Sequence, residues 1–320
     1  MNIRPDILER IRREAPCFCH VHQPEGRYVN DHCFIMKDGL VHLFHIEGQV
    51  GKTCMDEGNE ITIGHAVSRD LLHWEACAPA LVRDTGMAHE ERGVFAPFVM
   101  EKDGVFYMFY SSHNRHFAQY MCLALSRDLF HWTRHPGNPL FHPRGSKLFW
   151  DAGLPCSCRD PHIHHDAGNH RYIMFWVGDM AADRELSCIH ASVSPDLIRW
   201  EEANPVLVRR HSVHECLVMK TESPCLVWNH GLYYLFFRHG NGTKYCISRD
   251  PLDFNHCDAH YLSSAHAAEI FRHEGHWIIS SCSRSPLDII HREDRTKGLY
   301  VAGLSWEDMH PEVVDIFHTR

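Results

Sequence analysis

Hydrophobic and polar positions along the chain alternate in short runs that are typical of β-strands. Each clear unit consists of a strand, a polar turn with glycine, and a second strand rich in aromatic residues, as in residues 34–44 and 98–110. Asp-Gly or His-Gly between such runs favours a tight hairpin, because glycine accepts the positive φ angle that the turn needs. Similar units follow at 163–176, 226–237 and 270–279. The pattern therefore predicts five β-hairpins in series.

A second repeated element follows the hairpins. Residues 68–74 read Ser-Arg-Asp-Leu-Leu-His-Trp, and this heptad returns at 126–132 and 194–200, and in weaker form at 248–254. Residues 303–306, Gly-Leu-Ser-Trp, are a candidate for a fifth, degenerate copy. We expect the aspartate of each heptad to cap a turn and the aromatic residue to anchor packing between repeats.

The two elements together predict four strands per unit, repeated five times, at a spacing of roughly sixty residues. Four-stranded units arranged around an axis make a β-propeller, whose closure leaves only short, protected edges. We therefore predict an all-β, five-bladed β-propeller that spans residues 1–320 as a single domain. Residues 1–16 are expected to form a short N-terminal helical extension.

Composition narrows the class of partner. The formal net charge of −9 argues against nucleic acid, because phosphate contacts need clustered lysine and arginine. The N-terminus lacks the apolar core of a secretory signal, and no stretch has the length of a membrane span. We expect a cytoplasmic protein that does not bind membranes and whose 14 cysteines are free thiols. The sequence leaves the oligomeric state open.

Candidate chemistry lies just upstream of the hairpins, where the innermost strand of each blade would begin at the central channel. Asp31, Asp160 and Glu222 place a carboxylate there in blades one, three and four, at positions that we predict to be equivalent. Glycoside cleavage needs one carboxylic acid to protonate the leaving oxygen and one carboxylate as base or nucleophile. A third carboxylate can hold the sugar or tune the acid.

These residues resemble a known group, the five-bladed propeller glycosidases of glycoside hydrolase families 32 and 43, over about residues 20–306. The stretch from His22 to Asp31 resembles the opening of family 32, whose Asn-Asp pair carries the nucleophile. Arg159-Asp160-Pro161 matches the family's Arg-Asp-Pro motif, and Glu222-Ser-Pro is similar to its Glu-Cys-Pro motif. By contrast, Asp31 is followed by His-Cys-Phe rather than Pro-Asn-Gly, and residues 95–97 and 222–224 are closer to family 43 usage.

The resemblance implies a glycoside hydrolase that acts on short oligosaccharides or glycosides. A family 32 enzyme would use Asp31 as nucleophile, Asp160 as transition-state stabiliser and Glu222 as acid/base. A family 43 enzyme would use Asp31 to activate water, Asp160 to tune and position, and Glu222 as general acid. A β-fructofuranoside is the favoured substrate, followed by an α-L-arabinofuranoside or β-xyloside.

Two other functions fit the same sequence. One is a non-catalytic propeller that binds a carbohydrate or a protein, although retention of all three carboxylates speaks against it. The other is a propeller phosphorylase or transferase, which would need basic residues for phosphate beside the acid. His113, Arg115 and Arg238 could supply them.

The remaining predictions concern residues around the acids. Register selects Glu222 over Glu215 as the blade-four acid, because proline and the hairpin strand follow directly. Substrate-binding candidates come from all five blades: Asn30, Phe95, Trp150, Arg159, Arg238 and His266. We expect no metal and no cofactor, because the chain lacks Cys-x-x-Cys and His-Glu-x-x-His spacing. A structural cation in the channel near His266 is left open.

Overall fold

The structure of the protein is a computed structural model that describes residues 17–210, 212–214, 217–240, 242–283, 298–307 and 309–316. The predicted helix over residues 1–16 and the alternative acid Glu215 lie outside the described residues. None of the described helices is long and apolar enough to cross a membrane.

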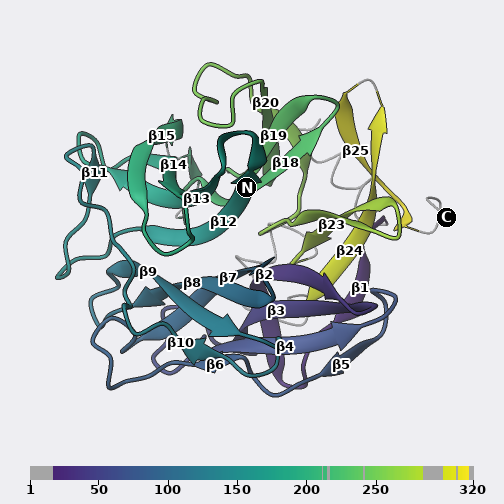
Figure 1. The fold of residues 1–320 in the computed structure, drawn as a ribbon, viewed down its shortest axis with the longest axis horizontal. Coiled ribbons are helices and arrows are strands. Elements are labelled where there is room, and N and C mark those ends of the chain that lie inside the picture. The colour runs from purple at the N-terminus through teal and green to yellow at the C-terminus, as the bar shows by residue number, and fades with distance from the viewer. Residues whose placement is uncertain are drawn as a thin grey trace.

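Within the described residues, five β-sheets follow one another around a common centre, and the chain passes once around the ring (Figure 1). Each sheet is one blade, and its strands run from the centre outward in chain order. Blade 1 contains β2 (Arg27–Lys37), β3 (Leu40–Gln49), β4 (Thr62–Ser68), β5 (Trp74–Ala76) and the short β6 (Leu81–Val82). Blade 2 contains β7 (Gly93–Lys102), β8 (Val105–His113), β9 (Gln119–Ser126) and β10 (Thr133–Arg134).

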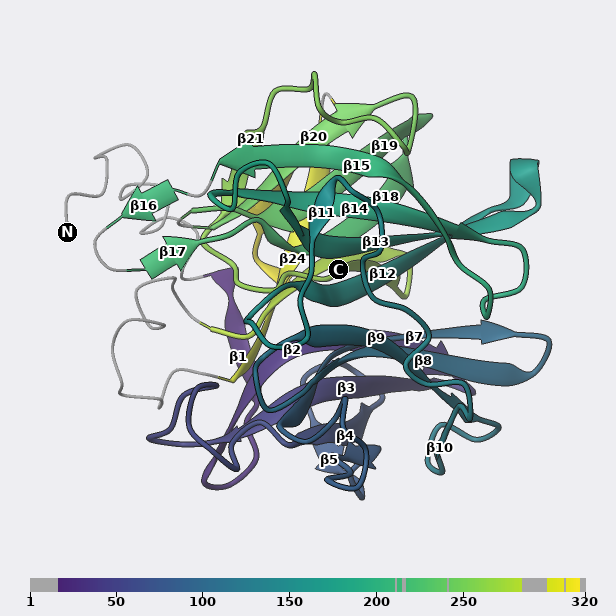
Figure 2. The same ribbon diagram turned by 90° about the vertical axis from the view of Figure 1, so that its left-hand side faces the viewer.

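The second half of the ring repeats this plan. Blade 3 contains β11 (Leu148–Phe149), β12 (Cys158–Asp166), the 3₁₀ turn η2 (Ala167–Asn169), β13 (Arg171–Met180), β14 (Leu186–Ser194) and β15 (Glu201–Arg210). A two-stranded ribbon of β16 (Ser212–His214) and β17 (Leu217–Met219) follows (Figure 2). Blade 4 contains β18 (Glu222–Asn229), β19 (Leu232–Arg238), β20 (Thr243–Ser248) and β21 (His260–Ser263). Blade 5 contains β22 (Ile270–His273), β23 (His276–Ser281), β24 (Leu299–Glu307) and β25 (His310–Val314).

The inner hairpins have the turn chemistry that the sequence predicts. Asp38 and Gly39 both have positive φ, at 51° and 75°, which is the signature of a type I′ turn. The same pair of positive φ angles recurs at 103–104, 230–231 and 274–275. In blade 3 the 3₁₀ turn η2 takes the place of this turn and ends at His170, whose φ is 51°.

The heptads also adopt one repeated geometry. Asp70 Oδ1 accepts the backbone N–H groups of Leu72 and His73, both at 2.9 Å, and the Trp74 indole donates to the Leu71 carbonyl at 2.9 Å. The copies at 126–132 and 194–200 make the same set of bonds. The prediction that the aspartates cap turns is therefore confirmed.

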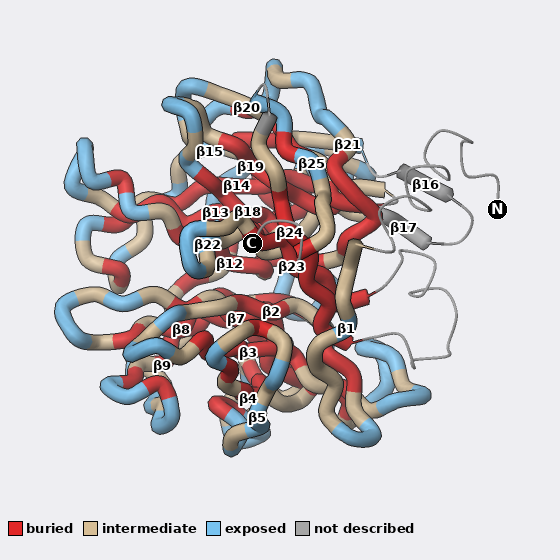
Figure 3. The backbone as a smooth tube through the Cα atoms, turned by 90° about the vertical axis from the view of Figure 1, so that its right-hand side faces the viewer, coloured by how far each residue is buried: buried red, intermediate tan, exposed pale blue. Residues whose placement is uncertain are grey.

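Packing between blades forms the core. Each neighbouring pair of blades shares its own cluster of buried side chains, and the second strand of each blade is buried along most of its length (Figure 3). Trp132 lies against Phe44 of blade 1, with ring centres 5.4 Å apart, and Trp200 lies against Phe109 of blade 2 at 5.7 Å. The aromatic residue of each heptad thus anchors its blade to the preceding one, as predicted.

Closure of the ring uses both ends of the described chain. β24 pairs with β25 along its second half, and along its first half with β1 (Cys19–His22), which precedes blade 1. The outer edge of blade 5 is therefore formed by two short strands, one from each end of the described chain. The prediction of a fifth heptad at 303–306 is wrong in one respect, because these residues lie inside β24 rather than in a turn. Trp306 still packs on blade 4, with its ring 4.7 Å from that of Tyr234.

Candidate active site

A bulge interrupts the innermost strand of each blade at the same place. Between Arg159 and His162 of β12, two residues face a single residue of β13. The register of β2, β7 and β18 shifts in the same way, at 29–32, 95–98 and 222–225. In blade 5, the His266 and Glu269 carbonyls accept the N–H groups of Cys282 and Ser280. Residues 267 and 268 therefore face the single residue 281, as in the other blades. Such bulges re-aim side chains and are frequent beside active sites.

The bulge determines how the three predicted carboxylates reach the centre. Each carboxylate has a different position relative to the bulge of its own strand. Glu222 is the last paired residue before the bulge of β18, Asp160 is the first bulged residue of β12, and Asp31 is the second bulged residue of β2. The prediction that they occupy equivalent positions is therefore wrong. Asp160 has a φ of 57°, and the first bulged residues of blades 2, 4 and 5 have φ angles between 45° and 51°. Asp31 and Asp160 line the central pocket, whereas Glu222 lies just outside the described lining and is joined to it through Arg159.

The pocket is a small hollow at the centre of the ring. All five blades contribute bulge residues or their neighbours to its lining, and Asp31 and Asp160 are among them. The described lining consists of Asp31, His32, Ala96, Pro97, Asp160, Pro161, Ser223, Pro224, Ala267 and Glu269.

Hydrogen bonds connect the carboxylates across blades. The Ser223 hydroxyl donates to Asp31 Oδ1 at 3.1 Å, and the Ser223 backbone N–H donates to Asp160 Oδ2 at 3.0 Å. Arg159 Nε lies 3.5 Å from Asp160 Oδ2, and its Nη2 donates to Glu222 Oε2 at 3.2 Å. Ser223 and Arg159 therefore join the three acids into one network.

Glu222 is surrounded by positive charge. Its Oε1 accepts a hydrogen bond from Arg238 Nη1, and the same oxygen lies 3.6 Å from His266 Nε2. Although burial acts to raise the pKa of Glu222, Arg238, His266 and Arg159 together hold it well below its usual value. Glu222 is thus ionised when the pocket is empty.

The two aspartates experience the opposite effect. Burial, together with the negative charges of Glu222 and Glu60, raises the pKa of Asp31, against the opposing hydrogen bond from Ser223. Burial also raises the pKa of Asp160; Arg159 opposes this rise, and the charges of Asp31 and Glu222 add to it. In a small pocket the like charges share protons, so Asp31 and Asp160 hold them more readily than Glu222 does.

Further residues around the site were not predicted from the sequence. Asp179 is buried, accepts a bond from Lys220 Nζ at 2.7 Å and another from the Ser157 N–H at 2.9 Å. Ser157 in turn accepts a bond from Arg159 Nη1 at 2.7 Å, which holds the guanidinium in place. Glu269 is a fourth carboxylate in the pocket lining, and burial and Asp31 raise its pKa to about 8. No sequence pattern marked Glu269, because only the strand pairing of blade 5 reveals the bulge that brings it to the pocket.

None of the six predicted substrate-binding residues belongs to the described pocket lining. Arg159, Arg238 and His266 contact Glu222 directly. Asn30 donates to Glu60 Oε1 at 3.2 Å. The other two stack on histidines. These are Phe95, which stacks on His113 with ring centres 4.0 Å apart, and Trp150, which stacks on His142 at 3.8 Å.

Comparisons with known proteins agree with this architecture. Residues 20–245 match the family model of the glycosyl hydrolases family 32 N-terminal domain. The sucrose:sucrose 1-fructosyltransferase of Festuca arundinacea is 31% identical over 128 residues, which cover 38% of this chain and 19% of that protein. The match thus spans about a fifth of that relative's length. The 1,2-β-oligomannan phosphorylase of a Thermoanaerobacter strain is 23% identical over 222 residues, 68% of this chain and 67% of that enzyme.

Solved structures show the same fold. The Bombyx mori family 32 β-fructofuranosidase superimposes with a TM-score of 0.68 at 18% identity, and covers 97% of this chain and 68% of its own. A thermostable family-43 glycoside hydrolase gives a TM-score of 0.65 at 17% identity, and the match covers 90% of this chain and 93% of that one. Because the family model covers well over half of the sequence, this chain belongs to the glycosyl hydrolases of family 32.

Proposed function

We propose that the protein hydrolyses the glycosidic bond of a short oligosaccharide or glycoside, with a β-fructofuranoside as the favoured substrate. The observation that carries this proposal is the network in which Ser223 joins Asp31 to Asp160 and Arg159 joins Asp160 to Glu222. It joins an acid, a nucleophile or base, and a third carboxylate in one network beside the pocket, and this is the set that glycoside cleavage requires. The proposed catalytic unit is a single domain over residues 1–320.

The proposed roles follow the family 32 pattern. Asp31 attacks the anomeric carbon while protonated Glu222 gives its proton to the leaving oxygen. Water, deprotonated by Glu222, then releases the sugar from Asp31. Asp160 binds the sugar and stabilises the oxocarbenium-like transition state. In the family 43 alternative, Asp31 activates water directly, and the anomeric configuration inverts.

The ionised state of Glu222 in the empty pocket bears on this mechanism. A general acid must carry its proton when the leaving oxygen arrives, and Arg238 and Arg159 disfavour that state. Proton transfer from the aspartates, or a lower pH, supplies the proton. We therefore propose that the enzyme works best on the acid side of neutrality.

The composition of the pocket lining supports a polar substrate, because Asp31, Asp160 and Ser223 offer groups that can bind sugar hydroxyls. We propose that a single sugar occupies the pocket while the leaving group lies toward its opening. A furanose is favoured over a pentopyranose because the chain belongs to family 32.

Phosphorolysis is a second candidate. Arg159, Arg238 and His266 gather at one carboxylate, and the phosphorylase match covers two thirds of both chains. Against it, both guanidinium groups are already paired with carboxylates, so that an incoming phosphate would have to displace them. Hydrolysis is therefore the proposal.

We propose a cytoplasmic location, supported by the thirteen cysteines in the described part of the chain, which are all free thiols. No bound cofactor is part of the proposed chemistry, and the proposed partner is the sugar substrate rather than nucleic acid or a membrane.

One experiment tests the proposed function. The purified protein is assayed with sucrose, aryl fructofuranosides, aryl arabinofuranosides and aryl xylosides, with and without inorganic phosphate, and NMR identifies the first-formed anomer. We expect fructoside hydrolysis at a rate that phosphate does not change, with retention at the anomeric centre. Sugar phosphate as the product would establish the phosphorylase instead. Turnover of none of these substrates would contradict the proposal.

A further inference from the structure

A second cluster of reactive side chains lies directly beyond the bulges. The residue that follows each bulge is His162 in blade 3, Cys225 in blade 4 and Glu269 in blade 5. One donor atom from each of these three side chains lies within 4.8 Å of the other two. Three neighbouring blades thus bring an imidazole, a thiol and a carboxylate together beside the pocket.

His162 is poised as a ligand. Its side chain is 8% exposed, and its Nδ1 has no hydrogen-bond partner among the described residues. A buried ring nitrogen without a hydrogen-bond partner is available to coordinate a metal ion, because neutral imidazole is a common metal ligand. A buried polar atom without a partner otherwise costs stability.

Cys225 and Glu269 complete the set. Cys225 is 1% exposed; its sulfur accepts the Ile270 N–H at 3.4 Å, and its S–H donates to the Ile270 carbonyl at 3.8 Å. Glu269 bonds to Cys225 and is repelled by Asp31, and none of the described lysine and arginine residues pairs with it. Because Glu269 also lines the pocket, an ion can reach the cluster from there.

We propose that His162, Cys225 and Glu269 form a binding site for a divalent transition-metal ion of the zinc type. The donor set of nitrogen, sulfur and oxygen suits zinc and excludes calcium and magnesium, which take oxygen ligands. A thiolate and a carboxylate neutralise the two charges of the ion, and Cys225 releases its proton when the ion binds. Three protein ligands leave the fourth position open, and the bound ion ties blades 3, 4 and 5 together at the channel.

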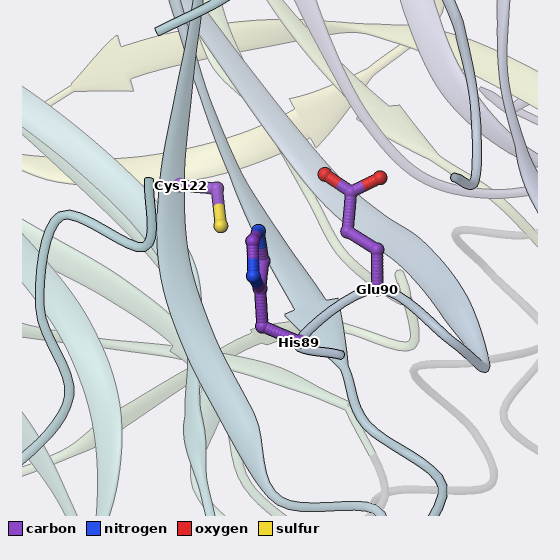
Figure 4. A group of neighbouring side chains, drawn as sticks. All are labelled: His89, Glu90 and Cys122. Atoms are coloured by element: carbon purple, nitrogen blue, oxygen red, sulfur yellow. The ribbon is translucent and has the colours of Figure 1, made fainter. Parts of the chain in front are cut away.

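The described residues contain a second group of the same composition, which serves as a contrast. His89, Glu90 and Cys122 also converge (Figure 4). There, however, Glu90 accepts bonds from Arg134 at 2.7 Å and from the Tyr110 hydroxyl at 2.6 Å. An arginine already neutralises this carboxylate, so that the group does not need an ion.

The proposed site also differs from a cation beside His266. Arg238 and Arg159 both lie against Glu222 near that histidine, and their charges would repel a further cation. The position beyond the bulge has no such neighbours among the described residues. This inference does not depend on the proposed glycosidase activity.

Metal binding itself tests the proposal. The full-length protein, with exposed Cys54 and half-buried Cys77 changed to serine, is stripped with a chelator and titrated with Zn²⁺ by calorimetry. We expect Cys225→Ser and Glu269→Gln each to weaken the tightest binding event by about 100-fold or more. Cys122→Ser is the matched control, because it removes a buried thiol from the contrasting group, and it leaves that event unchanged.

Co²⁺ provides a spectroscopic readout of the thiolate ligand. Co²⁺ bound at the site must give a thiolate charge-transfer absorption that Cys225→Ser abolishes and Zn²⁺ displaces, whereas Ca²⁺ does not. Absence of this absorption in the unmodified site, or its persistence in Cys225→Ser, overturns the proposal. Equal loss of binding in Cys225→Ser and Cys122→Ser, with circular dichroism showing both to be folded, also overturns it.

Discussion

Glu222 and Arg238 are direct cross-strand partners on β18 and β19, and the Arg238 guanidinium donates a hydrogen bond to the Glu222 carboxylate. Both side chains are largely buried, so that the attraction between their charges is screened little by solvent. The proposed general acid of this enzyme is therefore held in its ionised form by the strand pairing of blade 4 itself.

Arg238→Gln should move the pH dependence of the enzyme. Arg238 lowers the pKa of Glu222, so its removal raises that pKa. The active form pairs protonated Glu222 with ionised Asp31, although Asp31 holds a proton more readily, so that a higher pKa of Glu222 enlarges its share. We expect kcat to rise in the neutral and alkaline range, and the acid limb, which Glu222 sets in this order of pKa values, to move to higher pH. The measurement is kcat from pH 4 to 9 on one substrate; an unchanged profile would show that Glu222 is not the titrating acid.

Ser223→Ala should act on Asp31 alone. It removes the hydroxyl bond to Asp31 but keeps the backbone N–H bond to Asp160. Because that hydroxyl bond lowers the pKa of Asp31, its loss raises the pKa, so kcat should fall on the acid side and the alkaline limb, which Asp31 sets, should move to higher pH. An effect confined to the acid limb would instead link Ser223 to Glu222.

Asp70→Ala should destabilise blade 1 by about 1 kcal/mol, because capping bonds to two backbone N–H groups are lost. Asp128→Ala should cost a similar amount in blade 2, and the two losses should add, since the turns share no partners. Chemical denaturation measures both. The exposed neighbour Arg69 is the control, and Arg69→Ala should change stability by less than about 0.5 kcal/mol.

Buried histidines of blade 1 should make the fold sensitive to acid. Burial lowers the pKa of His65 to about 4 and that of His45 to about 3. Between pH 6.5 and 4 the unfolded chain therefore binds protons that the folded chain does not, and stability falls as the pH falls through this window. A shift of this size corresponds to roughly 3 kcal/mol for His65 at most.

His65→Phe tests this dependence. Phenylalanine keeps the stacking on Phe44, whose ring centre is 4.5 Å from that of His65, and removes the titrating group. The free energy of unfolding, measured by denaturant titration at a series of pH values, should fall less steeply with acid in the variant. His256→Phe, at an exposed position, is the control. An unchanged slope in His65→Phe would show that another group carries the acid sensitivity.

The sequence predicts the repeat more completely than the site. Asp-Gly turns and the heptads act locally, through φ angles and hydrogen bonds within a few residues, and the structure has both where they were expected. The pairing of β1 with β24 joins residues almost 300 positions apart, and no local pattern encodes it. The prediction of a fifth heptad at 303–306 was wrong because these residues belong to β24. Trp306 still packs on the preceding blade from within that strand.

The candidate site shows the same limit. Motifs located Asp160 and Glu222, but a bulge changes which way consecutive side chains point, and sequence spacing does not reveal it. The three carboxylates therefore come from successive positions of one motif rather than from equivalent ones. Glu269 was missed because the blade-five segment was aligned on His266, three residues earlier.

The most direct test of the account is the hydrolysis of sucrose by the wild-type protein, Asp31→Asn and Glu101→Gln. Glu101 is a surface residue of β7, paired with Lys37 at 3.6 Å, and controls for the loss of a carboxylate as such. We predict hydrolysis by the wild type, a loss of at least about 1000-fold in kcat for Asp31→Asn, and an unchanged rate for Glu101→Gln. Wild-type turnover by a folded Asp31→Asn protein would contradict the central claim that this pocket cleaves the glycosidic bond.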